Sequence, residues 1–353
     1  MKLKRFTDLS SLPPKLLEAL LAKARRLEND PVNTRLQGKV LALVFMNPSV
    51  RTLTSFQAGM AQLGGSSVVI SPGSTSWGFE WRQGVVMDGA AAEHLAEAVP
   101  VLEQYADALA LRSFGKGEDL HEDLCDPVLS AFAGYATKPF INMESATGHP
   151  CQALADWKTL DDLQVPRKGG RFVLSWAYHP RPLPFAVPAS VIEMAALRGM
   201  DVTVLRPDGF GLPEGVMERA RAAAARAGGS LSQTDRREEA LDGAHVLYAK
   251  SWQAPCAFGD PEKETALREH HRDWCVRESW FDAAHAEARF MHCLPVRRNV
   301  VVEDAVLDGP RSVVVQQAGN RLHVQKAVLT HLMSSSAAPQ SPDNPDRQCE
   351  EVK

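Results

Sequence analysis

Short apolar runs alternate with helix-like segments along this chain, and that alternation limits the folds open to it. The first half carries strand-like runs at residues 39–45, 67–71, 107–112 and 139–143. The second half carries them at residues 172–177, 201–205, 245–249, 289–293 and 312–315, followed by a helical pattern at about 318–333. Strands that alternate with helices are typical of parallel sheets covered by helices. We therefore predict an α/β protein with two parallel-sheet, three-layer domains.

A polar stretch at residues 164–170 separates the two series. It carries proline, glycine and charged residues without an apolar period. A chain of 353 residues is also too long for one compact core. The predicted domains are residues 1–163, joined by the last helix at about 318–333, and residues 171–317. The tail, residues 334–353, has no apolar period and is predicted to be disordered.

The composition favours a protein that acts on small molecules. The formal net charge is −4, and acidic and basic residues are interspersed without a basic stripe or a polybasic anchor. The first residues lead into a charged helical pattern, and no apolar run approaches about twenty residues. The six cysteines form no CxxC pair, so we expect reduced thiols. We predict a cytoplasmic protein with no nucleic-acid and no membrane partner.

The junction at residues 45–52 joins an apolar strand pattern to a helical one. Phe56, Met60 and Leu63 recur at helical spacings, and Asn47-Pro48-Ser49 forms the break. The first N–H groups of a helix lack carbonyl partners and can donate to an anion, and Arg51 with two nearby hydroxyls adds further donors. The segment therefore fits either a phosphate-binding loop or an ordinary capped strand-to-helix turn.

Polar residues follow several of the predicted strands. In open α/β sheets, ligands bind outside the carboxyl ends of the strands, so these residues should converge on one site. They are Ser49 to Thr52, Arg112, Glu144 with His149 and Gln152, Tyr178 to Pro182, Lys250, and Cys293-Leu294-Pro295.

Three short motifs, in their order and separations, resemble the aspartate/ornithine carbamoyltransferase superfamily. They are the phosphate loop Ser49-Val50-Arg51-Thr52, then His149-Pro150-Cys151-Gln152, and His292-Cys293-Leu294-Pro295. Each tetrapeptide is short, but three in order on matching elements are specific. The resemblance covers about residues 1–333 and implies the two-domain fold of that superfamily.

Two further segments are similar to the branch of that superfamily that acts on N-acylated ornithine. Ordinary ornithine carbamoyltransferases usually carry an Asp-x-x-x-Ser-Met-Gly loop, which this sequence lacks. The N-acylornithine branch also forms a knot through a proline-rich loop, which the resemblance puts at about residues 178–187. The similar segments are Trp77-Gly78-Phe79-Glu80, leading to Val86-Met87-Asp88-Gly89 and Glu93-His94, and Tyr178-His179-Pro180-Arg181-Pro182.

The resemblance also implies roles for individual residues. Carbamoyl transfer to an amine needs neither a metal nor a covalent intermediate, so we expect no cofactor. Arg51, Thr52 and His149 would act in catalysis, and Trp77 would come from a neighbouring subunit, which implies a homotrimer with shared active sites. Carbamoyl phosphate would be bound by Ser49, Val50, Arg51, Thr52, Trp77, Arg112, His149, Gln152, Cys293, Leu294 and Arg321. The acylornithine would be bound by Glu144, Lys250, Leu294 and Ala92.

Simpler readings exist for several of these residues. Arg112 fits a solvated charge after a strand, His149 a helix cap, and Trp77 an apolar anchor of a loop. Cys293 could suggest a nucleophile, but adjacent His292 would point to the opposite face of the strand, so covalent catalysis is disfavoured. The remaining histidine clusters lack metal-ligand spacing with acids or cysteines, and we predict no metal site.

Three positions depart from the family pattern. Leu53 stands where a second arginine is common, so the phosphate pocket is less cationic here unless another residue compensates. Ala92 stands where N-acetylornithine enzymes tend to have glutamate and N-succinylornithine enzymes proline. Val301 stands where some N-acetylornithine enzymes have lysine. Without a glutamate at position 92 there is no charge to repel a succinyl carboxylate, so both acyl groups are compatible with the sequence.

The sequence therefore predicts a carbamoyltransferase of arginine biosynthesis that acts on the δ-amino group of N-acetylornithine or N-succinylornithine. The alternatives are an ordinary ornithine carbamoyltransferase and a catalytically silent paralogue that binds carbamoyl phosphate. A dinucleotide-binding oxidoreductase fits the α/β alternation, but no GxGxxG follows the first strand of either half.

Overall fold

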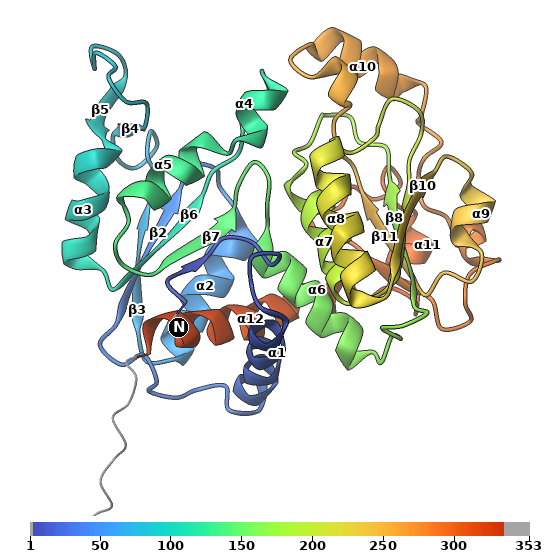
Figure 1. The fold of residues 1–353 in the computed structure, drawn as a ribbon, viewed down its shortest axis with the longest axis horizontal. Coiled ribbons are helices and arrows are strands. Elements are labelled where there is room, and N and C mark those ends of the chain that lie inside the picture. The colour runs from blue at the N-terminus through green and yellow to red at the C-terminus, as the bar shows by residue number, and fades with distance from the viewer. Residues whose placement is uncertain (1–2, 335–353) are drawn as a thin grey trace, which may run out of the picture.

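The computed structural model describes residues 3–334, which form two lobes side by side (Figure 1). Each lobe contains a five-stranded sheet in which every pair of neighbouring strands is parallel. Helices flank both sheets, as parallel strands require. The α/β fold with two parallel-sheet domains is thus confirmed, while the predicted disorder of the tail falls on residues outside the described range.

The N-terminal lobe has the strand order β1-β7-β6-β2-β3. Its central strand β2 is the unbroken apolar run VLALVF, which is buried along its length because helices cover both sides of the sheet. A small pair of parallel strands, β4 and β5, projects from this lobe as an arm (Figure 1). The elements are β1 (Arg5–Phe6), α1 (Pro14–Asn29), β2 (Val40–Phe45), α2 (Val50–Gln62), β3 (Ser66–Ile70), β4 (Gly78–Glu80), β5 (Ala91–His94), α3 (Leu95–Tyr105), β6 (Ala108–Arg112), α4 (Leu120–Leu124), α5 (Pro127–Tyr135), β7 (Phe140–Glu144) and α6 (Pro150–Asp162).

The C-terminal lobe has the strand order β10-β9-β8-β11-β12. Its elements are β8 (Arg171–Trp176), α7 (Ala186–Leu197), β9 (Asp201–Leu205), α8 (Glu214–Ala227), β10 (Ser230–Thr234), α9 (Arg237–Leu241), β11 (Val246–Lys250), α10 (Pro261–Glu269), β12 (Arg289–Met291) and α11 (Asp304–Leu307). The last helix, α12 (Val314–Met333), returns to pack against α1, α2 and α6 of the N-terminal lobe.

Helix α6 lies between the lobes, where it contacts both α12 and α7 (Figure 1). Residues 150–160 of this helix are all buried, including polar Gln152 and Asp156. A helix buried on all sides cannot show the polar and apolar faces of a surface helix. The polar side chains of α6 must therefore find partners inside the protein.

One predicted strand is wrong. The β-branched run at residues 312–315 suggested a strand, but Ser312 makes only an isolated bridge to Phe290, and α12 begins at Val314. Val313 and Val314 are buried at the start of this helix. A serine followed by three β-branched valines fits a buried helix start as well as a strand.

Several strands were not predicted. The edge strand β10 has the sequence SLSQT and no apolar run, because much of it faces solvent. β1 is only two residues long, and the arm strands β4 and β5 lack an apolar period as well. No helix within the described residues is long and apolar enough to span a bilayer.

Candidate active site

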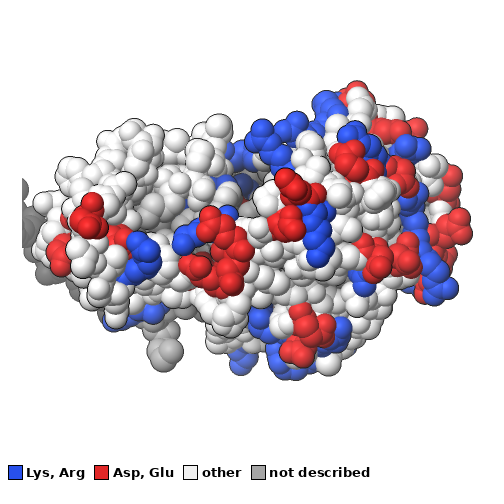
Figure 2. Space-filling model, turned by 90° about the horizontal axis from the view of Figure 1, so that it is seen from above, with Lys and Arg blue, Asp and Glu red and all other residues white. Residues whose placement is uncertain are grey.

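A cavity of about 200 Å³ lies between the two lobes. It is lined from the carboxyl ends of β2, β6 and β7 on one side and of β11 and β12 on the other, together with residues of α6, α12 and the segment after β8. Lys and Arg side chains gather at the hollow between the lobes when the molecule is seen from above (Figure 2). The predicted site residues that line the cavity are Ser49, Arg51, Thr52, Arg112, Glu144, His149, Gln152, Lys250, Cys293, Leu294 and Arg321.

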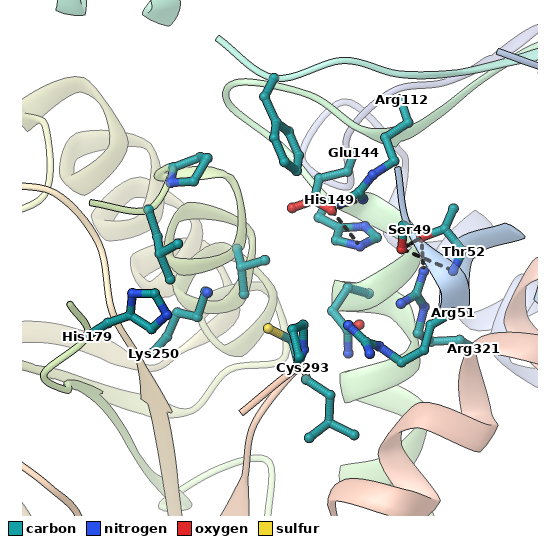
Figure 3. A pocket seen from close by; sticks show the side chains of 17 residues that line it. Ser49, Arg51, Thr52, Arg112, Glu144, His149, His179, Lys250, Cys293 and Arg321 are labelled. Atoms are coloured by element: carbon teal, nitrogen blue, oxygen red, sulfur yellow. Dashed lines mark hydrogen bonds and ion pairs between the residues drawn. The ribbon is translucent and has the colours of Figure 1, made fainter. Parts of the chain in front are cut away.

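The start of α2 is fixed by hydroxyl groups. Ser49 caps the helix, and its Oγ accepts from the backbone N–H of Thr52 at 3.3 Å and donates to Thr52 Oγ1 at 3.1 Å. Arg321, from α12, donates to the same Thr52 Oγ1 at 2.8 Å (Figure 3). The junction is therefore a capped turn, as one interpretation of the sequence predicted, and it is also part of the cavity wall, while phosphate binding by it stays a prediction.

Positive charge dominates the cavity. Arg51, Arg112, Lys250 and Arg321 line it, opposed by the single carboxylate of Glu144. Burial lowers the pKa of both Arg51 and Arg321 below the usual arginine value, and the other guanidinium groups around them act in the same direction. A guanidinium nevertheless stays charged in proteins. An anion in this cavity would relieve the repulsion among these groups.

Glu144 and His149 form a polar group at the N-terminal wall of the cavity. Glu144 accepts a hydrogen bond from Arg112, and its Oε2 lies 3.4 Å from Nε2 of His149. Burial, together with the positive charges of Arg321, Arg112 and Arg51, holds the pKa of His149 well below its ordinary value. The imidazole is therefore neutral near pH 7 and carries one N–H, which can donate to a carbonyl oxygen.

Other polar groups of the cavity come from α6 and from the segment after β12. Gln152 donates through Nε2 to Asp156 Oδ1 at 2.8 Å, while its Oε1 is buried without a partner. Leu294 follows β12 in a left-handed conformation with φ +56°, and its N–H donates to His292 Nδ1 at 2.9 Å. The unpaired Oε1 of Gln152 is an acceptor suited to a ligand that carries an NH₂ group.

Cys293 is a poor candidate for a nucleophile. Burial raises the pKa of its thiol, which disfavours the reactive thiolate. The neighbouring His292 has its pKa lowered well below the ordinary value by burial, and its Nδ1 is already occupied by the N–H of Leu294. The geometry thus agrees with the expectation against covalent catalysis.

Three predicted site residues do not line this cavity. Val50 is 79% exposed at the start of α2. Trp77 is 60% exposed beside β4, where its Nε1 donates to Glu93 Oε2 at 2.5 Å, and Ala92 is exposed on β5. Trp77 and Ala92 therefore belong to the arm and not to the cavity of their own chain.

The other two departures from the family pattern also lie outside the cavity wall. Leu53 is partly buried and packs against the core of the chain. Val301 is 2% exposed, and its carbonyl accepts from the N–H of Val276. Neither side chain adds polarity to the cavity.

Residues to which the sequence assigned no individual role complete the cavity, although His179 and Pro295 lie in segments that were predicted to converge on it. His179, directly after β8, lines it together with Lys250, and its Nε2 accepts from Arg297 Nε at 3.1 Å. The position of His179 after a strand was a usable signal, but nothing in one sequence shows which residues of the loop face inward. The remaining lining residues form a largely apolar wall: Phe114, Leu183, Pro184, Val187 and Pro295.

Both halves of the chain match known domains. Residues 4–162 match the carbamoyl-P binding domain of aspartate/ornithine carbamoyltransferase, and residues 186–332 match its Asp/Orn binding domain. The chain belongs to the aspartate/ornithine carbamoyltransferase family.

Relatives with named activities indicate the branch of this family. The chain is 43% identical to the N-acetylornithine carbamoyltransferase of Xanthomonas campestris pv. campestris over 339 residues, which cover 95% of this chain and 99% of the relative. It is 35% identical to the N-succinylornithine carbamoyltransferase of Bacteroides thetaiotaomicron over 334 residues, covering 94% and 99%. Together they support the N-acylornithine branch.

Solved structures agree with this placement. An acetylornithine transcarbamylase complexed with acetylcitrulline superposes with a TM-score of 0.92 at 42% identity, covering 94% of this chain and all of the other. An N-acetyl-L-ornithine transcarbamylase variant with one glutamate replaced by alanine, complexed with carbamyl phosphate and N-succinyl-L-norvaline, superposes with a TM-score of 0.91 at 43% identity, with the same coverage.

Proposed function

We propose that this protein transfers the carbamoyl group of carbamoyl phosphate to the δ-amino group of an N-acyl-L-ornithine. The products are an N-acylcitrulline and phosphate, formed in the cytoplasm as part of arginine biosynthesis. The observation that carries this proposal is the cavity between the lobes, which is lined by four cationic side chains and by the start of α2. The named activities of relatives in the same branch support it.

The phosphate of the donor would occupy the α2 side of the cavity. The free N–H groups at the start of α2, the hydroxyls of Ser49 and Thr52, and the guanidinium groups of Arg51 and Arg321 supply donors suited to a dianion. Arg112 adds charge from the end of β6, although it also pairs with Glu144. Leu53 leaves the pocket with one arginine fewer than is common in the family, and Arg321 supports Thr52 from another helix.

The carbamoyl group would lie between the two walls. Attack by the neutral δ-amine forms the carbon–nitrogen bond and places negative charge on the carbonyl oxygen. As the carbonyl re-forms, the bond from its carbon to the phosphate oxygen breaks, and the departing phosphate takes the proton that the amine gives up. Arg51, Thr52 and neutral His149 are donors that favour this charge, and such stabilisation in a preorganised site lowers the barrier. Oε1 of Gln152 and the backbone carbonyls of Cys293 and Leu294 would accept from the carbamoyl NH₂.

The acylornithine would occupy the side formed by the C-terminal lobe. Lys250 and the nearby Arg297–His179 pair provide positive charge for its carboxylate, and Leu183 and Val187 offer apolar surface to its alkyl chain. Glu144 and the backbone of Leu294 would complete this part of the site. Because the amine must reach the carbamoyl carbon, a shared cavity for both substrates is the arrangement the reaction needs.

We further propose a homotrimer in which the β4–β5 arm completes the site of a neighbouring subunit. Among the described residues, every exposed large apolar side chain except Val315 precedes residue 125, and several of them lie on β3, on the arm or on α3. The visible face of the N-terminal lobe is also poorer in charged side chains than that of the C-terminal lobe (Figure 2). Concentrated apolar exposure of this kind is typical of protein–protein contacts.

In that trimer Ala92 would face the acyl group of the substrate. An alanine provides no negative charge against a distal carboxylate, and the relative crystallised with N-succinyl-L-norvaline carries an introduced alanine. We therefore propose that both N-acetylornithine and N-succinylornithine are substrates. Val301 is buried and uncharged, so it neither attracts nor repels the acyl group.

The experiment that tests this function offers ornithine, N-acetylornithine and N-succinylornithine separately, at equal concentration, with carbamoyl phosphate. We expect citrulline derivatives from the acylated substrates alone. Turnover of free ornithine would identify an ordinary ornithine carbamoyltransferase. No turnover with any substrate, despite binding of carbamoyl phosphate, would favour the silent paralogue.

We also propose the residue limits of the domains. The first comprises residues 1–163 with the last helix at 318–333, and the second comprises residues 171–317. The polar segment at 164–170 between α6 and β8 supports this division, as does the packing of α12 on the N-terminal lobe. The knot expected at residues 178–187 stays a prediction.

A further inference from the structure

A carboxyl group lies fully buried one helical turn beyond Gln152, outside the cavity wall. Asp156, on α6, accepts hydrogen bonds on the same Oδ1 from Gln152 Nε2 at 2.8 Å and from Gln317 Nε2, on α12, at 2.7 Å. Its Oδ2 is buried without a hydrogen-bond partner. Burying a carboxyl group costs free energy unless its partners compensate, so this position calls for an explanation.

The two glutamines connect Asp156 to both walls of the carbamoyl site. Gln152 lines the cavity, and its Oε1 has no partner within the described chain. Gln317 accepts through Oε1 from the backbone N–H of His292 at 3.0 Å, and its Nε2 also lies 3.2 Å from the hydroxyl of Tyr248 on β11. His292 Nδ1 in turn accepts from the N–H of Leu294 at 2.9 Å.

The direction of each hydrogen bond follows from the carboxyl oxygen. A glutamine amide has a donor end and an acceptor end of similar size, so its orientation depends on its partners. Oδ1 of Asp156 can only accept, which turns the NH₂ of both glutamines towards it. The acceptor end of Gln152 is then left for the cavity, and the acceptor end of Gln317 is left for the N–H of His292.

We infer that Asp156 is a positioning residue that sets the hydrogen-bond polarity of the site for the carbamoyl NH₂. This inference rests on the proposed function, because it assigns a purpose to Oε1 of Gln152. A reversed Gln152 would present its own NH₂ to the NH₂ of the ligand, and donor would face donor. Through Gln317 and His292, the same carboxyl group also holds the backbone of Cys293 and Leu294, which carries the other acceptors. One buried side chain is thus linked through hydrogen bonds both to α6 of one lobe and to the segment directly after β12 of the other.

The protonation of Asp156 does not alter this arrangement. Burial raises the pKa of Asp156 to about 7, so both forms are populated near neutral pH. A proton on Oδ2 leaves Oδ1 free to accept from both amides. An asparagine whose Oδ1 takes the same place would preserve the two hydrogen bonds, whereas an alanine would remove the acceptor and admit a water that can donate or accept.

The test compares the binding of carbamoyl phosphate and of inorganic phosphate to the intact protein by titration calorimetry. Inorganic phosphate lacks the NH₂ group and reports on the phosphate loop alone. For Asp156→Ala we expect affinity for carbamoyl phosphate, and kcat/KM for it, to fall about tenfold or more, while affinity for inorganic phosphate changes less than about threefold. Asp156→Asn should restore carbamoyl phosphate affinity to within about threefold of the original protein, because the acceptor is kept.

Two further variants complete the design. Thr159→Val is a matched control, because it removes a buried hydrogen bond between α6 and Asn320 of α12 without touching the site, and it should leave both affinities unchanged. Gln317→Met keeps the Asp156–Gln152 contact but removes the link to His292. It should weaken the binding of carbamoyl phosphate more than the binding of inorganic phosphate. This variant carries the test if Asp156→Ala does not fold.

The inference would be overturned if Asp156→Ala lost affinity equally for carbamoyl phosphate and for inorganic phosphate. It would also be overturned if Asp156→Asn lost as much carbamoyl phosphate affinity as Asp156→Ala. Unchanged carbamoyl phosphate affinity in Gln317→Met would overturn the part that involves His292. Because the calorimetric affinities are measured without turnover, these outcomes stay separate from a failure of the proposed function, which would show as no product with any acylornithine.

Discussion

Residues 49–52 and the β4–β5 arm both belong to the N-terminal lobe, yet only the first is held in place by the rest of its own chain. Thr52 Oγ1 accepts from the side chains of both Ser49, three residues away, and Arg321, 269 residues away in the sequence. On the arm, the indole of Trp77 donates to Glu93 on the paired strand, and the side chain is exposed. The start of α2 is thus held by contacts within one chain, whereas the arm presents surface that no other part of residues 3–334 covers.

In the proposed trimer, this difference separates the groups that one chain holds in place by itself from those that need a neighbouring subunit. Fixed donors around an anion need no further ordering when the ligand binds, and so they favour both binding and catalysis. An exposed indole gains a defined position only against another surface. We therefore expect the phosphate loop to set the rate and the arm to set substrate choice.

The largest effect should come from Arg51→Ala. This change removes a charge-assisted contact that strengthens as the carbonyl oxygen gains charge, and we expect kcat/KM for carbamoyl phosphate to fall about a hundredfold or more. Steady-state kinetics at saturating acylornithine measures this. Arg35→Ala is the control, because Arg35 is exposed and only 3.6 Å from equally exposed Asp30. Near-normal turnover of Arg51→Ala would break the assignment of the phosphate loop.

The next largest effect should come from Trp77→Ala, with a loss of about tenfold or more in activity if the arm serves a neighbouring site. Mixing this variant with Arg51→Ala is the sharper measurement. Randomly mixed trimers should regain about a quarter of the native sites, since some sites receive Arg51 from one subunit and Trp77 from the next. No recovery after subunit exchange would show that the sites are not shared.

A smaller and selective effect is expected from Ala92→Glu. The new carboxylate would repel a succinyl carboxylate from the neighbouring site, lowering kcat/KM for N-succinylornithine about tenfold relative to N-acetylornithine. Ala92→Gln has nearly the same size without the charge and should change the ratio little. If both variants alter the two substrates alike, position 92 does not face the acyl group.

The smallest effect concerns pH and stability. The folded pKa of Asp156, about 7, lies above the usual aspartate value, so the unfolded chain releases this proton first as pH rises. The contribution of Asp156 to the free energy of unfolding is therefore present at low pH and declines towards pH 7. Between pH 4.5 and 7.5, we expect the free energy of unfolding of Asp156→Asn to rise by about 1 kcal/mol or more relative to that of the original protein. Urea unfolding at both pH values measures the difference in free energy of unfolding between the two proteins. A difference that does not change with pH would contradict the raised pKa of Asp156.

Much of the fold could be predicted because buried parallel strands are continuous apolar runs. β2 and β6 are runs of this kind, so the sequence predicts them. The convergence of Arg112, Lys250 and Leu294 follows from the rule that the carboxyl ends of parallel strands share one edge of a sheet. The short or exposed strands β1, β4 and β10 carry no such signal. The run at residues 312–315 shows the opposite error, because a buried helix start and a strand share the same composition.

The site could be predicted only where a residue is identified by its neighbours in sequence. The phosphate loop meets this condition, since its conformation and its chemistry lie within four residues. His179 does not, because its inward position depends on Arg297 and on the course of the segment after β8. Asp156 was invisible for a similar reason: its partners come from α6, α12 and β11, and no local pattern marks a carboxyl group that orients amides.

The return of α12 to the N-terminal lobe has a consequence for how the protein is made. A chain growing on the ribosome has its phosphate loop long before Gln317 and Arg321 exist, and domains tend to fold as they emerge. Until α12 has been synthesised, the N-terminal lobe therefore has α1, α2 and α6 partly uncovered and lacks the guanidinium that supports Thr52. Synthesis must therefore be almost finished before Arg321 can take its place in the cavity wall and Gln317 its place behind it.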